Sequence, residues 1–311
     1  MKRNILVFTL ISIVLIGCCK VKTNKDLNDI VNLNSSEYKL LLNPSYFSDY
    51  NIGFENYWSL IKEVAAENNI PIIENDNPLK PSHKHIGFFD TENMDLRKNG
   101  YMIRRKIKFN NGVPNSGVEF SLKFRSSKPE IAGTADVKTG EGFTPEHDEI
   151  ELESDVVYYS VKNGEKETTF SVQNVIKLDE NPNLTVGDFA KIYPVLTTLN
   201  IPFDEELKLI ADTEPVEYMV RPGKLDFGDG LYGRMDMTIW LVEFGGELIS
   251  IPEFSFDHPF YEDREFDKEA MERCTSFINR LQEKNTDWVI PGKLKAAYLF
   301  DYENGKNKDN N

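Results

Sequence analysis

The 311-residue sequence is poor in the residues that build covalent or metal-bound scaffolds, with three cysteines and four histidines. Cys19 and Cys274 form neither a disulfide framework nor a zinc-ligand spacing, and their bonding stays open at this stage. Basic residues are also outnumbered, 36 against 51 acidic ones, which gives a formal net charge of −15. So acidic a chain is a poor candidate for general nucleic-acid binding, and we expect no nucleic-acid partner.

Long apolar runs are lacking except at the N-terminus. A lysine and an arginine there precede an apolar segment over 5–16, which is too short to span a bilayer and has the layout of a secretory signal. The segment ends in Leu-Ile-Gly-Cys, at Cys18, which resembles a bacterial lipobox. We therefore expect 1–17 to be a lipoprotein signal peptide and 18–34 a lipid anchor and flexible tether. Acylated Cys18 would hold the exported chain at a bacterial cell membrane. The alternative is an ordinary signal peptide with a chance cysteine.

The rest of the chain mixes strand patterns with amphipathic helix patterns. Apolar residues at helical spacing predict helices over 54–68, 185–199 and 267–284, with a short one over 293–300. Alternating patterns predict strands over 37–42, 88–106, 118–124, 149–153, 216–225, 232–244 and 248–256. Parallel crossover units are few, which favours an α+β fold, an antiparallel β-barrel (tunnel) with helices packed on the outside. This domain should cover 35–302, with insertions near 126–147 and 160–183 and a disordered tail over 303–311.

Several predicted strands carry polar side chains at every second position. These are Glu37 and Lys39; Arg104 and Lys106; Glu119, Ser121, Lys123 and Arg125; and Glu149, Glu151 and Glu153. Alternate strand residues share a face, so each group lies on one side of its strand. One interpretation is a sheet with a solvent-exposed face. The other is a closed barrel whose apolar outside is covered by helices. Its polar interior could then hold a polyanion and a divalent cation.

The stretch over 88–106 reads as strand, tight polar turn and strand. It resembles the signature of the CYTH domain, the triphosphate tunnel metalloenzyme family, in which the pattern is FDTxxxxLRxxGxxLRxR. The residues here are FDTENMDLRKNGYMIRRK. In that family, basic residues on opposed strands cradle a linear triphosphate, and acidic residues bind magnesium or manganese. The resemblance implies a tunnel-shaped barrel and a partner such as inorganic polyphosphate or another polyanion.

The resemblance also assigns site residues, although no catalytic residue follows from it. The implied phosphate-binding residues are Lys39, Arg104, Lys106, Lys123, Arg125 and Arg221. The implied ligands of Mg²⁺ or Mn²⁺ are Glu37, Glu151 and Glu253. Ser35 and Ser255 stand where the family carries acids, and the aspartate expected before the last strand is matched only by Glu243, out of place. Serine hydroxyls bring no charge to a divalent ion, so the cationic half of the site is better kept than the metal half.

Three interpretations of function follow. The first is a membrane-anchored CYTH-like lipoprotein that acts as a divalent-metal-dependent triphosphate or polyphosphate hydrolase with a degenerate metal site. The second is a non-catalytic envelope lipoprotein on the same fold that binds an anion or a partner. The third is an unrelated barrel with a polar outer face and an apolar lumen for lipid. The side chains at 37, 104, 123 and 221 discriminate among them, because only the first two interpretations bring them into one enclosed interior.

Overall fold

The computed structural model describes residues 33–147, 150–160, 165–261, 265–284, 286–290 and 292–309. The predicted signal peptide, Cys18 and almost all of the predicted tether lie outside these residues. Among the described residues, none of the helices combines the length and apolar character needed to cross a membrane.

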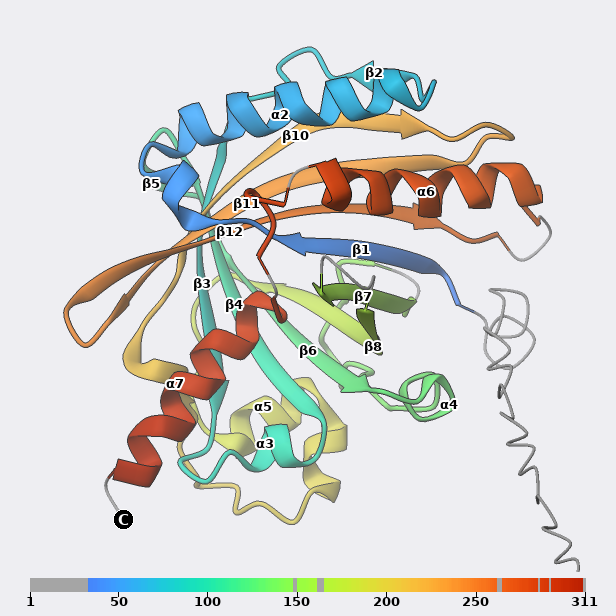
Figure 1. The fold of residues 1–311 in the computed structure, drawn as a ribbon. Coiled ribbons are helices and arrows are strands. Elements are labelled where there is room, and N and C mark those ends of the chain that lie inside the picture. Colours follow the sequence, from blue (N-terminus) through green and yellow to red (C-terminus); the bar gives the residue numbers. More distant parts are fainter. Residues whose placement is uncertain are drawn as a thin grey trace, which may run out of the picture.

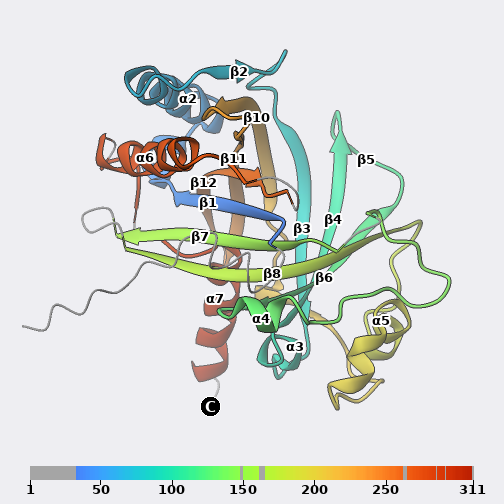
Figure 2. The ribbon, with the colours of Figure 1, turned by 90° about the vertical axis from the view of Figure 1, so that its right-hand side faces the viewer.

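Nine strands close into a barrel (Figures 1 and 2). Their order around the barrel is β10 (Val216–Asp226), β11 (Tyr232–Phe244), β12 (Glu247–Pro259), β1 (Ser35–Leu41), β7 (Leu152–Ser160), β8 (Glu165–Leu178), β6 (Val118–Ser126), β4 (Tyr101–Asn110) and β3 (Ser82–Asp90). Pairing of β3 with β10 completes the circle. The predicted closed barrel is confirmed. It is not wholly antiparallel, however, because β1 runs parallel to β7.

Short elements decorate this barrel. The strands are β2 (Ile72–Glu74), β5 (Val113–Pro114) and β9 (Lys208–Leu209), and the short helices are η1 (Pro44–Phe47), α3 (Asp95–Lys98), α4 (Pro129–Ala132) and η3 (Ile210–Asp212). The turn between β3 and α3 belongs to the sequence signature and is held by Asp90. There the buried Asp90 carboxylate accepts hydrogen bonds from the N–H groups of Thr91 and Leu96, both at 2.8 Å, and of Arg97 at 2.9 Å. The aspartate of the signature therefore caps the turn and uses both carboxylate oxygens on backbone N–H groups.

Helices cover the outside of the barrel in two groups. The helices α2 (Tyr50–Glu67) and α6 (Lys268–Lys284) pack on β1, β7, β10, β11 and β12, at the top of Figure 1. The helices α5 (Val186–Ile192) and η2 (Pro194–Thr198) pack on β4, β6 and β8 and lie away from α2 in Figure 2. The three longer predicted helices are confirmed, although the one over 185–199 is interrupted at Pro194, whose ring cannot continue an α-helix.

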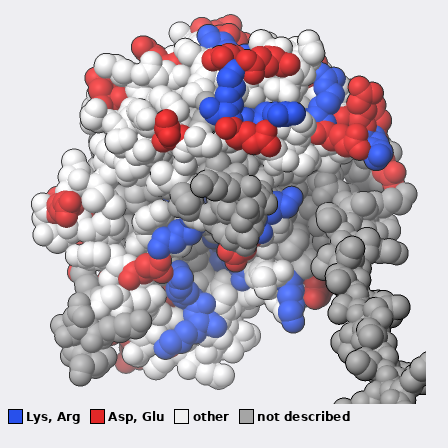
Figure 3. All heavy atoms as spheres, in the orientation of Figure 1, with Lys and Arg blue, Asp and Glu red and all other residues white. Residues whose placement is uncertain are grey.

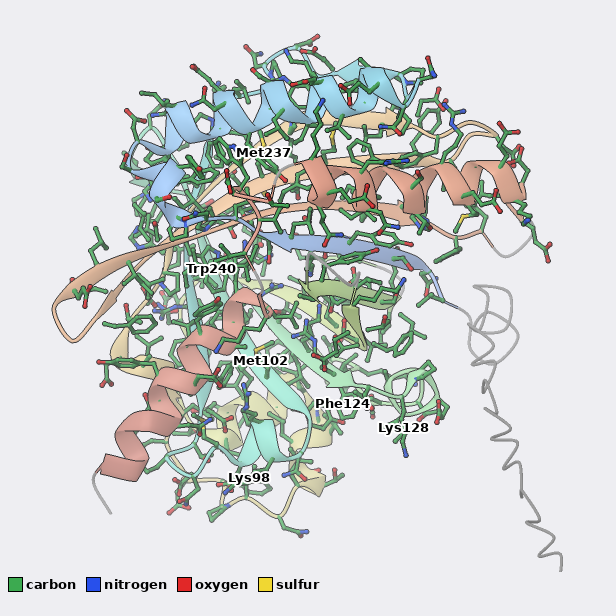
Figure 4. All side chains as sticks on the ribbon, in the orientation of Figure 1. Lys98, Met102, Phe124, Lys128, Met237 and Trp240 are labelled. Carbon is green, nitrogen blue, oxygen red and sulfur yellow. The ribbon has the colours of Figure 1, made fainter. Side chains whose placement is uncertain are left out.

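The C-terminal segment differs from the prediction. Instead of a short helix and a disordered tail, one helix, α7, spans Lys295–Asp309. Leu299 and Phe300 are buried against Phe88 and Trp240 at one end of the barrel, and Trp240 lies beside α7 in Figure 4. Because this packing fixes the first turns, the polar residues that follow can extend an existing helix without a new nucleation step.

Two strands on the β7–β8 side were also placed wrongly by the pattern. The acidic strand begins at Leu152, not at 149, and the predicted insertion over 160–183 contains the long strand β8 of the barrel wall. Strand β8 alternates outward Phe170, Val172 and Ile176 with polar residues, so it has a strand pattern of its own. The segment over 126–147 is mainly loop, as expected, with α4 inside it.

Candidate anion-binding site

The polar faces of the strands point into the barrel. On β6, Phe120 and Leu122 belong to the outer core under α5, so Ser121 and Lys123 face the opposite side. On the other side of the barrel, Tyr38 and its alternate neighbours on β1 pack under the outer helices in the same way. In the closed barrel, the polar residues of each alternating strand therefore line the interior, and the apolar residues pack outward under the helices.

Asp155 on β7 is the centre of one ion-pair cluster, with a side chain that is 1% exposed. Its Oδ1 accepts from Lys39 Nζ at 2.5 Å and its Oδ2 from Arg125 at 2.8 Å, while Lys123 Nζ lies 4.0 Å from Oδ2. Burial alone would raise the pKa of Asp155, but the three cations outweigh burial and hold this pKa well below its usual range. Lys39 also contacts Glu37 at 2.7 Å. Burial opposes the charge of Lys39, yet the two carboxylates raise its pKa.

Glu217 on β10 is the centre of a second cluster. Its Oε2 accepts from Trp240 Nε1 at 2.8 Å, its Oε1 lies 3.1 Å from Lys84 Nζ, and Lys295 Nζ lies 3.8 Å from Oε2. Burial disfavours the charged carboxylate, but the two ammonium groups and the indole N–H outweigh it and lower the pKa of Glu217 to about 2. Lys295, from α7, is also 3.2 Å from Glu253 Oε1. Burial raises the pKa of Glu253, and Lys295 counteracts part of this rise.

Between the two clusters, β4 and β6 present a row of donors. We call Arg104, Lys106, Ser121 and Lys123 the cationic wall. Lys123 lies 3.4 Å from Glu153 Oε2 and belongs also to the Asp155 cluster, whereas the other three make no ion pair within the described residues. Arg104 is opposite Ser121 in the strand register, and Lys106 follows on the same face. The Arg104 guanidinium donates to the neutral Gln173 Oε1 at 3.2 Å. Its Nε and the Ser121 hydroxyl are buried without any hydrogen-bond partner in the described part of the chain.

Lys106 is the most unbalanced charge of the cationic wall. Within the described ranges, its ammonium group makes no ion pair shorter than 4.0 Å. The positive charge of Arg104, then burial, then the charge of Lys84 lower the pKa of Lys106 to about 7. Burial likewise lowers the pKa of Arg104, against the weaker opposing effect of Glu217. This part of the interior therefore has positive potential that the neighbouring carboxylates do not neutralise.

Carboxylates face the interior from the strands across the barrel. Asp236 on β11 contacts Arg221 at 3.1 Å, and Asp257 on β12 binds Arg234. Burial raises the pKa of both acids, and the negative charge of Glu37 adds to the rise. Each of these acids already pairs with a cation of the chain. In the part of the chain that is described, no three Asp, Glu, His or Cys side chains come together in a way that could hold a metal ion. The acids as placed therefore do not fit the divalent-ion site that the resemblance implied.

The structure brings together most of the predicted site residues but not all of them. Those that face the interior are Lys39, Arg104, Lys106, Lys123, Arg125, Glu37 and Glu253. Arg221 does not join the cationic wall: its side chain is 66% exposed at a bulge in β10, beside Asp236. Glu151 is exposed and precedes β7, whose interior positions are Glu153 and Asp155. Acids occupy every second position from Glu149 to Asp155, so the alternating pattern alone could not show that Glu153 and Asp155 are the two that face the interior.

Six charged interior residues were not singled out from the sequence: Lys84, Asp155, Glu217, Asp236, Asp257 and Lys295. Glu217 lies on a strand that was predicted but not searched for charge, and Lys84 lies in the first half of β3, before the predicted start at residue 88. Asp236 lies two residues after an arginine in the alternating run of β11, where the analysis considered only Glu243, nearer the end of the strand. Alternation could have found these three. Lys295 enters the interior from a helix, and no local sequence signal predicts that.

The outer surface has a different charge pattern from the interior. On α2 and α6, Lys284 lies 2.7 Å from Glu63 and also binds Glu67. Figure 3 shows acidic and basic side chains intermixed over these helices. Exposed pairs of this kind stabilise a fold weakly, by about 0–1 kcal/mol each. Arg104 and Lys106 differ from the surface cations because they are buried in the barrel interior, where solvent screening of their charge is weaker.

No protein-family model and no curated protein matches this sequence. The solved structures that it resembles include three of low sequence identity. A Hippeastrum protein described as an adenylyl cyclase candidate with a dominant triphosphatase activity is 15% identical, with a TM-score of 0.42, over 86% of this chain and 96% of that one. An adenylate cyclase candidate from Bacillus halodurans is 14% identical, with a TM-score of 0.38, over 85% and 96%. A protein from Pyrococcus horikoshii is 13% identical, with a TM-score of 0.34, over 87% and 99%. At such identities and TM-scores no activity carries over to this chain.

Proposed function

We propose that the barrel interior binds a linear inorganic polyphosphate, with triphosphate as the simplest ligand, on the cationic wall. One observation carries the proposal: Arg104 Nε and the Ser121 hydroxyl are buried without partners in the described chain, next to the unpaired ammonium of Lys106. Leaving a buried donor unsatisfied costs about 1–3 kcal/mol, and more for a charged group. A ligand that supplies anionic oxygens at this position would remove that cost.

The arrangement of the donors favours a chain of phosphates over a single one. Arg104 and Lys106 are alternate residues of β4, and Ser121, Lys123 and Arg125 are alternate residues of β6. Alternate residues of a strand are about 6.6–6.8 Å apart, so the donors form a row that exceeds the reach of one phosphate group. Arginine can bind phosphate oxygens in pairs, and lysine supplies a mobile point charge. The CYTH-like signature over 88–106 implies the same ligand class.

Hydrolysis of the bound polyphosphate is the second candidate, favoured by the acids Glu37, Asp236 and Asp257 across the barrel. The negative charge of Glu37 contributes to the raised pKa of both Asp236 and Asp257, which places the three acids in one electrostatic neighbourhood. A metal-dependent triphosphatase would need such acids for Mg²⁺ or Mn²⁺. Here they pair with lysine and arginine side chains, so binding is the function that this geometry supports better.

Titration of the purified protein with tripolyphosphate tests the proposal. We expect saturable binding that weakens with added salt, accompanied by a rise in melting temperature. Replacing Arg104 by methionine should weaken the affinity about 10- to 100-fold, because charge-assisted hydrogen bonds contribute about 1.5–3 kcal/mol. Lys98→Met is the matched control: it removes one positive charge from the surface of α3, and Figure 4 shows Lys98 at a distance from the barrel interior.

Two results would refute or extend this proposal. If tripolyphosphate does not bind, or if both variants lose affinity equally, the cationic wall is not the binding site. A phosphate-release assay with Mg²⁺ or Mn²⁺ then separates the two candidates. Release that disappears in Glu37→Gln identifies an enzyme, whereas binding without release identifies a polyphosphate-binding protein.

We also propose that acylated Cys18 holds the barrel at a bacterial membrane, because the lipobox-like sequence places a cysteine directly after a secretory signal. The expected result is that the wild-type protein sediments with membranes and has a mass increased by acyl chains. Cys18→Ser should be recovered unacylated in the soluble fraction. A Cys19→Ser variant is the matched control and should remain membrane-bound. Recovery of wild-type protein without acyl chains would contradict the anchor.

A further inference from the structure

Lys295, the first residue of α7, extends its side chain into the barrel. The side chain is 10% exposed. Its Nζ donates to Thr238 Oγ1, lies 3.2 Å from Glu253 Oε1 and 3.8 Å from Glu217 Oε2, and is 5.1 Å from the ring centroid of Trp240. One ammonium group is therefore surrounded by two carboxylates, a hydroxyl and an aromatic face, contributed by β10, β11 and β12.

The rest of α7 holds Lys295 in this position. Leu299 and Phe300 are buried in the cluster that closes this end of the barrel, and the Arg97 guanidinium stacks on Phe300 at 4.2 Å. Further along the helix, Glu303 Oε2 accepts a hydrogen bond from the Ala211 N–H at 2.8 Å. The packing of Leu299 and Phe300, the stacking of Arg97 and the hydrogen bond of Glu303 all fix the position of α7. Lys295 could leave the interior only if these contacts were lost, so its ammonium is a permanent part of the interior.

The oxygens around Lys295 are of the kind that a hard divalent ion prefers. Two buried carboxylates need nearby positive charge, and carboxylate and hydroxyl oxygens are ordinary ligands of Mg²⁺ or Mn²⁺. Here that charge comes from Lys295, assisted by Lys84 at Glu217. An ion bound by Glu253 would lie within a few ångströms of the ammonium and be repelled by it.

We propose that Lys295 is a built-in cation that takes the place of a divalent metal ion on this side of the barrel, so that the interior binds polyphosphate without a metal. The proposal rests on the proposed function for its ligand. The charge argument itself concerns only Lys295 and its two carboxylates, and it is tested without polyphosphate.

Titration with Mn²⁺ alone, in the full-length protein, gives the first test. The wild-type protein should bind Mn²⁺ only weakly. Lys295→Met should bind it at least about tenfold more tightly, because a repelling charge is gone and two buried carboxylates have lost a partner. Lys295→Arg keeps the charge and should behave like the wild type. Lys293→Met is the matched control, since it removes a half-exposed lysine that pairs with Asp301 outside this cluster.

A double variant locates any Mn²⁺ that is gained. Lys295→Met combined with Glu253→Gln removes one charge of each sign, so the gain should disappear. Tight Mn²⁺ binding by the wild type, no gain in a folded Lys295→Met protein, or a gain that persists in the double variant would each overturn the proposal. Thermal melting of every variant shows that it is folded.

A further measurement needs only the wild-type protein and so stands even if Lys295→Met does not fold. The tripolyphosphate affinity is measured in EDTA and in Mg²⁺, and the Mg²⁺ value is corrected for ligand that Mg²⁺ binds in solution. The two affinities should then agree within about twofold. A strict requirement for Mg²⁺ would overturn the role of Lys295. Complete absence of tripolyphosphate binding would instead refute the proposed function and leave the Mn²⁺ result to decide the role of Lys295.

Discussion

Replacing Asp155 by asparagine is expected to lower the free energy of unfolding by about 3–5 kcal/mol, the usual cost of removing one member of a buried ion pair. The amide leaves Lys39, Lys123 and Arg125 without their shared carboxylate in an interior where Asp155 is 1% exposed. Urea unfolding at neutral pH measures the change. The control is Glu283→Gln on α6, which removes an exposed partner of Arg280 and should change stability by less than about 1 kcal/mol.

The pH dependence distinguishes this electrostatic effect from a packing defect. The pKa of Asp155 is lower in the folded protein than in the unfolded chain, so its stabilisation is complete above the unfolded value. It is lost as pH falls through the lower, folded value. The difference between wild type and variant should therefore be largest near neutrality and should shrink in acid. A difference that stays constant down to about pH 2–3 would show that the amide disturbs packing instead.

Tripolyphosphate should partly reverse the defect. With Asp155 neutralised, the three freed cations attract an external anion more strongly, so the ligand should raise the melting temperature of Asp155→Asn by more than it raises that of the wild type. Equal increases would mean that the ligand does not reach the Asp155 cluster. This comparison also tests the position of the cationic wall, because Lys123 belongs both to it and to the Asp155 cluster.

The sequence predicted which strand faces are polar, because alternation is a local property. Lys39 was predicted from the pattern of β1 and Lys123 from that of β6, and both face the interior. The apolar residues between them predicted the outer layer as well. Closure of the barrel followed from having three amphipathic helices available to cover the apolar faces, and the structure agrees.

The pairing of charges could not be predicted in this way. Lys39 and Asp155 are 116 residues apart, and Lys84 and Glu217 are 133 apart, so their contacts depend on the order and register of strands. Register also decided which acid of the alternating strand β7 meets Lys39, since a shift of two residues keeps the same face but changes the partner. The entry of Lys295 depends on how α7 docks, a property of tertiary packing alone.

These pairs explain why the cationic wall can exist in a stable fold. The Asp155 and Glu217 clusters neutralise most of the buried cations, so only a small part of the interior remains positive. That part is flanked by the ion pairs of the two clusters, which engage the nearby carboxylates Asp155 and Glu217. A site prepared in this way loses little side-chain freedom when an anion binds.

The affinity for tripolyphosphate should fall as pH rises above about 7, because Lys106 must be protonated to bind the anion and its pKa in the free protein is about 7. The bound anion attracts the Lys106 ammonium and offsets its repulsion by Arg104, so it raises the pKa of Lys106. Binding should therefore take up as much as one proton, and the dissociation constant should increase by at most about tenfold per pH unit. Calorimetry in two buffers of different ionisation enthalpy measures the uptake directly.

Two substitutions assign the proton to Lys106. Lys106→Arg keeps its charge at any accessible pH and should bind with little change over the same range, whereas Lys106→Met should bind weakly and without this proton uptake. The terminal phosphates of the ligand also titrate, but that contribution is common to all three proteins. If Lys106→Met takes up as many protons as the wild type, the titrating group lies elsewhere.

The stability of the free protein tests the low pKa of Lys106 independently. Between about pH 7 and 10.5, the unfolded chain holds a proton on Lys106 that the folded protein does not. The contribution of Lys106 to the free energy of unfolding should therefore increase with pH in the free wild-type protein, and saturating tripolyphosphate should remove this increase.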